Sequence, residues 1–239
     1  MINKEPTRFP KIKCPYQRET DKDGRYVMTP RHNNGYMWVN DPMQSIAVEK
    51  IHGTNCAVQI QNGRVKHVWT RIGNKDMNLV HEYNGGLEHI RICRAVQNSV
   101  RKGIVSEIDG TYFGETLGKN FHSNMYDLDK DYFIPFKWAR KNLKYYSWGE
   151  HGTSFKDIEE WFKDGLFSLL YQYFHGCSFK EASVTSGVFV EGVMFYREKF
   201  AATCFKPDKD VVVDATDFAK MRRDMFKGCK DWPGTILKH

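Results

Sequence analysis

The chain has 239 residues, 41% of them hydrophobic and 27% charged, which is enough to bury one sizeable core. No apolar run approaches the ~18 residues that a membrane span needs, and the N-terminal residues contain no apolar signal segment, so we expect a soluble cytoplasmic protein. The net charge of +7 permits an anionic partner such as nucleic acid without requiring one. The six cysteines form no C-x-x-C pair, which predicts free thiols and indicates neither a zinc site nor a disulfide framework.

Short stretches rich in β-branched or alternating residues recur along the chain and predict antiparallel strands. Gln61-Asn62-Gly63 predicts a hairpin turn between the first two stretches, and Asp109-Gly110 predicts a turn between a later pair. The expected strands cover residues 57–60, 65–70, 104–108, 112–113, 188–196, 202–206 and 211–213.

Apolar stripes at helical spacing lie between these strands. The longest covers residues 155–174, where Ser154 and Asp157 predict a capping box at the helix start. A weaker amphipathic pattern covers residues 87–101. The mixture predicts an α+β class in which helices pack on antiparallel sheets.

The C-terminal part carries a third apolar stripe, which predicts a short basic helix ended by Gly228. We therefore expect one domain over residues 1–213 and a basic helix with a tail over residues 214–239. The stripe consists of Phe218, Met221 and Met225.

The most informative stretch surrounds Lys50, which has a glycine, Gly53, at the third following position. A lysine at the end of an extended segment, followed by a glycine that lets the backbone approach a ligand, suits an amine nucleophile facing a nucleotide phosphate. Taken alone, this four-residue pattern is weak, because composition alone can produce it.

Further motifs follow Lys50 in a fixed order and strengthen this interpretation. They are T-R-I-G at residues 70–73, F-G-E-T-L-G at residues 113–118, E-G-V at residues 191–193, and a lysine at the end of C-F-K at residues 204–206. This order resembles the covalent nucleotidyltransferase superfamily of polynucleotide ligases and capping enzymes. The segment E-K-I-H-G-T-N, from Glu49 to Asn55, resembles the ATP-dependent RNA ligases of the bacteriophage RNA ligase 2 type.

The resemblance implies an adenylyltransferase domain whose antiparallel sheets form a nucleotide cleft. It implies that Lys50 attacks the α-phosphorus of ATP, holds AMP covalently, and passes it to a 5′-phosphate end that a 3′-hydroxyl then joins. A lysine attacks only as the neutral amine, so neighbouring cations are needed, and Lys206 and Arg71 are the candidates. Mg²⁺ or Mn²⁺ is the implied metal, bound by Glu191, because hard cations prefer carboxylate oxygen.

The remaining implied contacts surround the nucleotide. Glu115 is expected to accept from the ribose hydroxyls, and Arg71 to engage the ribose or phosphate. Val193 is expected on one face of the adenine, with Phe136 on the other, although Phe133 is also open and core packing is an alternative for each.

The segment around the nucleophile is expected to contribute its own contacts. Glu49, Ile51 and Gly53 are expected to bind the nucleotide, and His52 is expected to assist the nucleotide-transfer steps because it shares the face of Lys50 in an extended chain.

Two departures from the family pattern leave alternatives open. Cys204 stands where the family's K-x-K motif has its first lysine, and too few residues follow Lys206 for the family's additional C-terminal domain. We expect RNA ends as the substrate, in a nicked duplex or a single strand, with a separate nucleic-acid-binding partner as one option and the host cytoplasm as the location if the protein is viral. The alternatives are a GTP-dependent capping guanylyltransferase and a nucleotide- or nucleic-acid-binding module with weakened catalysis.

Overall fold

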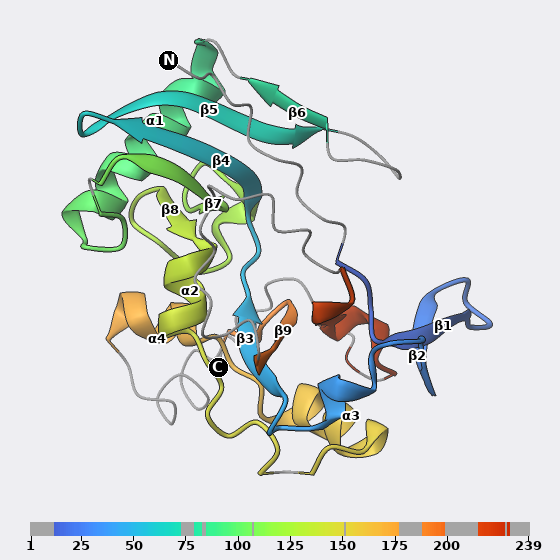
Figure 1. Ribbon diagram of the computed structural model, residues 1–239. Coiled ribbons are helices and arrows are strands. Elements are labelled where there is room, and N and C mark those ends of the chain that lie inside the picture. Colours follow the sequence, from blue (N-terminus) through green and yellow to red (C-terminus); the bar gives the residue numbers. More distant parts are fainter. Residues whose placement is uncertain are drawn as a thin grey trace. The chain divides into compact units, whose positions relative to one another are not determined.

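The computed structural model describes residues 12–72, 79–82, 85–106, 108–150, 152–176, 188–198, 215–227 and 229 (Figure 1). Helices and antiparallel sheets both contribute, so the chain is of the α+β class, as the sequence predicts. The described residues divide into two compact units. The first, which we call the five-stranded unit, spans residues 52–142; the second, the three-stranded unit, combines residues 12–51 with the described residues from 143 onward.

The five-stranded unit contains one antiparallel sheet with the strand order β6-β5-β4-β7-β8. A two-residue turn joins β4 to β5, and the φ angles of Asn62 and Gly63, 52° and 68°, confirm the predicted hairpin. The elements are β4 (Thr54–Gln61), β5 (Arg64–Ile72), β6 (Leu79–Glu82), α1 (Gly86–Arg101), β7 (Gly110–Leu117), the 3₁₀ turn η2 (His122–Asn124), β8 (Tyr132–Pro135) and α2 (Phe136–Asn142).

Helix α1 confirms the amphipathic pattern of the sequence and packs on the sheet, where it contacts β5, β7 and β8. Its buried side chains include Ile92 and Val96, and Ser99 Oγ accepts a hydrogen bond from the Phe133 N–H at 2.8 Å. The helix thereby fixes the position of β8 at the edge of the sheet.

The strand expected over residues 104–108 is wrong. After α1 the chain turns at Gly103, whose φ is 75°, and the N–H groups of Ile104 and Val105 both donate to Ser99 O. Both side chains are buried. These apolar residues therefore close the C-terminal end of α1 rather than pair with a neighbouring strand.

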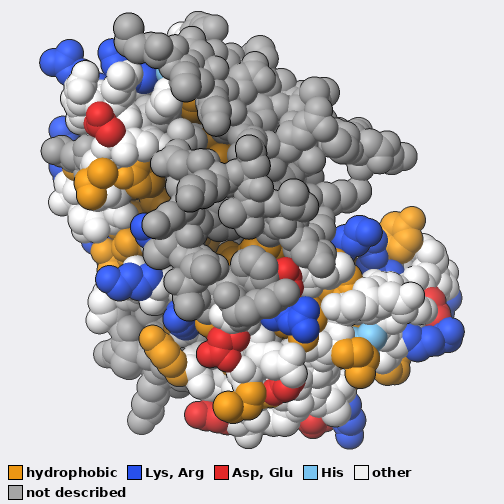
Figure 2. Space-filling view, in the orientation of Figure 1, with side chains coloured by type: hydrophobic (Ala, Val, Ile, Leu, Met, Phe, Trp, Pro, Cys, Tyr) orange, Lys and Arg blue, Asp and Glu red, His pale blue; other side chains and the backbone are white. Residues whose placement is uncertain are grey.

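The three-stranded unit contains an antiparallel sheet with the order β10-β9-β3 and a separate hairpin of β1 and β2. Figure 2 shows Lys and Arg side chains spread over the surface of this hairpin. The elements are β1 (Tyr16–Thr20), β2 (Tyr26–His32), η1 (Met37–Asn40), β3 (Ser45–Lys50), α3 (Phe155–Asp164), α4 (Leu169–His175), β9 (Gly192–Arg197), η4 (Ala215–Asp217), β10 (Phe218–Arg222) and η5 (Arg223–Met225).

The predicted helix over residues 155–174 is two helices, α3 and α4. The capping box is confirmed, since the Asp157 N–H donates to Ser154 Oγ while the Ser154 N–H donates to Asp157. Gly165 ends α3, and the chain between the helices pairs with residues 188–190, with the Ser168 N–H donating to Val188 O at 2.8 Å. This long-range pairing interrupts the helical periodicity.

The basic helix expected around Phe218 is also wrong. Residues 218–222 form strand β10, which pairs with β9 in antiparallel register, and Ala219 and Met221 enter the core. The stretch preceding Arg223 therefore belongs to the central sheet of the three-stranded unit.

Four cysteines lie in the described part, and all four are free thiols, as expected: Cys14, Cys56, Cys93 and Cys229. Burial raises the pKa of the Cys56 thiol to about 12. The predictions for Cys177 and for the strands at 202–206 and 211–213 concern residues outside the described part. Among the helices that the structure describes, none is both long and apolar enough to span a membrane.

Candidate active site

Lys50 lies at the end of β3, where the register of the three-stranded sheet determines its neighbours. It pairs with Gly192 on β9, and Gly192 pairs with Arg222 on β10. Directly paired residues of antiparallel strands point to the same face, so this row carries a cation at each end and no side chain in the middle. A Cβ at Gly192 would clash with the backbone at Met221 and Arg222, which explains the glycine.

Glu191 lies immediately before β9 and contacts both cations. Lys50 Nζ donates a hydrogen bond to Glu191 Oε2, and Arg222 Nε lies 3.8 Å from Glu191 Oε1. The side chains of Glu191 and Lys50 are only 7% and 19% exposed. A buried carboxylate needs such partners, because its desolvation is costly. The structure thus brings together two residues that the motif order predicts to share a site.

Lys220 and Arg222, which the sequence analysis assigned to a basic helix, form a cationic pair on strand β10. The two residues are separated by one position, so they share a face of the strand, while Ala219 and Met221 are buried on the other. The triplet K-M-R at residues 220–222 lies on the strand that pairs with β9, which follows Glu191 directly. The signal was the alternation of polar and apolar residues, which the helical interpretation of this segment obscured.

Val193 lies on the opposite face from Lys50, which does not support its expected contact with the adenine. It pairs with Glu49 rather than Lys50, is 0% exposed, and packs in the core with Phe195 and Met221. Strand alternation instead places Met194 on the face of Lys50 and Arg222. Met194 is half-buried, and it is the apolar residue of β9 that follows Gly192 on that face.

The side chain of Glu49, which is also expected among the nucleotide-binding residues, is directed toward α4. Glu49 is 2% exposed, and its carboxylate accepts hydrogen bonds from Ser168 Oγ at 2.6 Å and from the Leu170 N–H at 2.8 Å, at the start of α4. Burial raises the pKa of Glu49 to about 7, and these hydrogen bonds partly offset the increase. Glu49 therefore anchors α4. The side chain of Ile51 is buried as well.

In the five-stranded unit, the motif continues with Gly53 and Asn55 beside Glu115. Asn55 on β4 pairs with Glu115 on β7, and its Nδ2 donates to Glu115 Oε1 at 3.3 Å. A Cβ at Gly53 would come within 2.7 Å of Thr116 O, so only glycine permits this approach to β7. The last residue of E-K-I-H-G-T-N therefore orients the carboxylate of F-G-E, a role that sequence reasoning did not assign.

The two aromatic candidates of the five-stranded unit differ in accessibility. Phe133 on β8 is 0% exposed and packs close to Gly114, so it is a core residue. Phe136, the first residue of α2, is half-buried. Phe136 is therefore the more accessible of the two aromatic candidates.

His52 is held by two neighbours within the five-stranded unit. Its backbone N–H donates to the Tyr126 hydroxyl at 2.9 Å, and its ring meets the ring of His122 edge-on at a centroid distance of 4.9 Å. Arg71 is a β5 residue whose backbone pairs with Val80, but its side chain lies outside the described part, as does the whole of Lys206.

Glu191 is the candidate metal ligand, and it stands without a cluster of similar groups. Among the described residues, no group of three His, Cys, Asp or Glu side chains is arranged to hold a metal ion. One carboxylate fits a Mg²⁺ that arrives with the phosphates of a nucleotide, because Mg²⁺ commonly takes one or two carboxylates and completes its coordination with phosphate oxygens and water.

Comparison with known proteins adds no assignment: no family model matches the chain, and no curated protein matches it.

Proposed function

We propose that the chain is an ATP-dependent RNA ligase that joins 5′-phosphate and 3′-hydroxyl ends through a lysyl-AMP intermediate at Lys50. The hydrogen bond between Lys50 and Glu191 carries the proposal. These residues are 141 positions apart and belong to two motifs whose order resembles the ligase superfamily. Arg222, on a third strand, extends the same row.

The proposed first step forms a bond between Lys50 Nζ and the α-phosphorus of ATP. The bond from that phosphorus to the oxygen bridging to the β-phosphorus breaks, and pyrophosphate leaves. Nζ must give up a proton before it attacks, and the Glu191 carboxylate, which accepts its hydrogen bond, is positioned to take it. Lys220 and Arg222 supply positive charge for the phosphates.

The two later steps use the same phosphorus and then the 5′ end. An oxygen of the 5′-phosphate attacks the α-phosphorus, the N–P bond breaks, and Lys50 regains its proton. The 3′-hydroxyl then attacks the 5′-phosphorus, loses its proton and expels AMP. Glu191 would be the residue that holds a Mg²⁺ or Mn²⁺ ion arriving with ATP, and the ion would supply positive charge for the phosphates.

Each unit offers its own candidate contacts for the nucleotide. In the three-stranded unit, Met194 is an apolar side chain on the face of Lys50. In the five-stranded unit, Phe136 is a half-buried aromatic side chain that suits stacking on a base. Glu115, held by Asn55, accepts from the ribose hydroxyls. Lys50 and Gly53 are only three residues apart in the chain, which supports the use of both parts of the motif in one reaction.

Self-adenylation tests the proposal directly. The protein is incubated separately with α-labelled ATP and α-labelled GTP, and the intact mass is measured. We expect an AMP adduct with ATP that is lost in Lys50→Ala and retained in Lys66→Ala, a matched control because Lys66 is an exposed lysine on β5. An adduct formed only with GTP would favour the capping guanylyltransferase, and no adduct would favour a binding module.

RNA is the proposed strand because the E-K-I-H-G-T-N segment resembles the RNA-joining branch. Labelled nicked duplexes and single strands, each made of RNA or DNA, separate the substrate classes on a denaturing gel. Joining of DNA nicks without joining of any RNA substrate would overturn this choice.

A further inference from the structure

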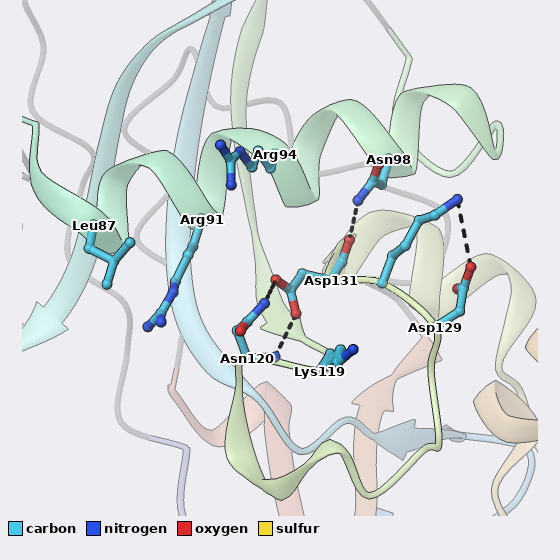
Figure 3. A pocket seen from close by; sticks show the side chains of 9 residues that line it. Leu87, Arg91, Arg94, Asn98, Lys119, Asn120, Asp129 and Asp131 are labelled. Atoms are coloured by element: carbon cyan, nitrogen blue, oxygen red, sulfur yellow. Dashed lines mark hydrogen bonds and ion pairs between the residues drawn. The ribbon is translucent and has the colours of Figure 1, made fainter.

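A cavity of about 370 Å³ lies in the five-stranded unit between α1 and the loops that follow β7 and precede β8. Figure 3 shows side chains of α1 facing the loop residues Asn120 and Asp131 across it. The lining residues are Leu87, Arg91, Arg94, Asn98, Lys119, Asn120, Asp129, Lys130 and Asp131. The proposed ligase reaction uses none of them.

The cations of this cavity exceed what its own carboxylates neutralise. Arg91 pairs with Glu88 at 2.9 Å, and Lys130 lies 3.6 Å from Asp129 at the exposed rim. Arg94 and Lys119 form no ion pair with the residues that the structure describes. The cavity therefore attracts an anion, and its arginines offer planar donor groups that suit phosphate.

The remaining carboxylate is engaged in holding the cavity together. Asp131 is 8% exposed, and its two oxygens accept hydrogen bonds from the Asn120 N–H at 2.8 Å and Asn120 Nδ2 at 2.7 Å. Asn98 Nδ2 donates to Asp131 O at 3.0 Å and ties the loop to α1 (Figure 3). The carboxylate oxygens of Asp131 therefore accept hydrogen bonds from the loop and not from the arginines. Because these hydrogen bonds hold the loop in place, the walls of the cavity are formed before any ligand binds.

The composition of the lining indicates which part of a nucleic acid it contacts. None of the nine lining residues is aromatic, so bases have no stacking partner, and Leu87 is the only apolar one. Arg91, Arg94 and Asn98 fall on one side of α1 by helical spacing. Such donors contact phosphates and fix the position of a strand without reading its sequence.

We propose that this cavity binds the phosphodiester backbone of the RNA strand that is joined. The choice of RNA rests on the proposed function, whereas the anionic ligand follows from the charges of the cavity. Binding at this position is independent of base sequence and weakens with added salt.

Paired charge-removing variants test the proposal. Arg91→Gln with Arg94→Gln removes two lining cations, and Arg64→Gln with Arg101→Gln removes two from a different cavity, on another side of α1. Fluorescence anisotropy with a labelled, nicked RNA duplex measures affinity across a salt series. We expect the first pair to weaken binding about tenfold and to reduce the salt slope by about two, with at most a twofold change in the control.

A variant with the opposite charge change gives a second readout. Asp129→Asn removes an exposed carboxylate from the rim beside Lys130, so we expect it to strengthen RNA binding. The thermal unfolding midpoint of each variant is measured alongside. Unchanged RNA affinity in Arg91→Gln/Arg94→Gln, an equal loss in the control pair, or equal competition by polyglutamate overturns the proposal.

The self-adenylation assay separates this proposal from the ligase function. We expect Arg91→Gln/Arg94→Gln to form the AMP adduct at the wild-type rate. If Arg91→Gln/Arg94→Gln forms a normal adduct and binds RNA as tightly as the wild type, the cavity proposal alone is overturned. If the wild type forms no adduct but Arg91→Gln/Arg94→Gln binds RNA more weakly than the wild type, the ligase function alone is overturned.

Discussion

The two faces of the three-stranded sheet differ in what they contact, although their residues alternate along the same strands. One face enters the core, where Val193, Phe195 and Met221 pack with Ile158 and Phe162 of α3. The opposite face carries the candidate nucleophile and its ionic partners. One strand therefore supplies both stability and chemistry, at adjacent positions.

The clearest contrast lies between consecutive residues. Glu49 and Lys50 point to opposite faces; the Glu49 carboxylate anchors α4, whereas Lys50 reaches Glu191. Val193 and Met194 divide in the same way. The pairing register of the strands therefore decides whether a motif residue lies in the core or at the site. A shift of one position would move each residue to the other face of the sheet.

The largest effect on the reactive face is expected from Glu191→Gln. This change removes the carboxylate that accepts the hydrogen bond of Lys50, so we expect the rate of lysyl-AMP formation to fall about 100-fold or more, measured with α-labelled ATP. Asp224→Asn is the matched control, because Asp224 contacts Arg222 at 2.6 Å and is 39% exposed in its side chain. Equal losses in both variants would refute a special role for Glu191.

A smaller loss is expected when the cations of β10 are removed. Lys220→Gln and Arg222→Gln are each expected to slow lysyl-AMP formation by about tenfold to 100-fold, because the phosphates of ATP lose positive charge. Arg222→Lys should retain more activity than Arg222→Gln. The exposed Lys227 supplies the control Lys227→Gln, and a comparable loss there would indicate a general effect of net charge.

The contrast between Val193 and Met194 predicts effects in different measurements. Val193→Ala creates a cavity in the core and is expected to lower the free energy of unfolding by about 2 kcal/mol, with an unchanged Kd for ATP. Met194→Ala is expected to raise the Kd for ATP several-fold and to lower stability less. Calorimetric titration measures the Kd for ATP, and urea denaturation measures the free energy of unfolding. The reverse pattern would mean that Val193 faces the nucleotide and Met194 faces the core.

Local signals in the sequence predicted the parts of the fold that local interactions determine. Asn62-Gly63 predicted the β4–β5 hairpin because both residues adopt positive φ, and Ser154 with Asp157 predicted the start of α3. The break between α3 and α4 was missed, since it depends on pairing with residues 188–190. Strand β10 was missed for the same reason: its apolar residues also fit a helix, and only β9 selects the strand.

Some features of the site follow from the order of the motifs along the chain, and others depend on the pairing register of the strands. The order of the motifs predicted that Lys50 and Glu191 meet, and the structure confirms their contact. The sequence could not show that Lys50 pairs with Gly192, so it could not show that Val193 lies on the face opposite to Lys50. The charge of the α1 cavity was equally hidden, because its cations come from a helix and two separate loops.

The last expected effect concerns pH and the core face. The pKa of Glu49 in the folded protein, about 7, lies above its ordinary value of 4.5 because the carboxyl is buried. The folded state therefore holds the proton more tightly than the unfolded state, so the stabilisation is complete below pH 4.5 and is lost as the pH rises to about 7. Glu49→Gln keeps a neutral group and removes this dependence.

Urea denaturation of both proteins at a series of pH values measures the effect. Relative to the wild type, the free energy of unfolding of Glu49→Gln is expected to increase by up to about 3 kcal/mol between pH 4.5 and 7. Glu160→Gln, a change at an exposed glutamate of α3, should show no such increase. Parallel pH curves for the wild type and Glu49→Gln would mean that Glu49 has the same pKa in the folded and unfolded chains. Burial beside α4 would then not raise the pKa of Glu49.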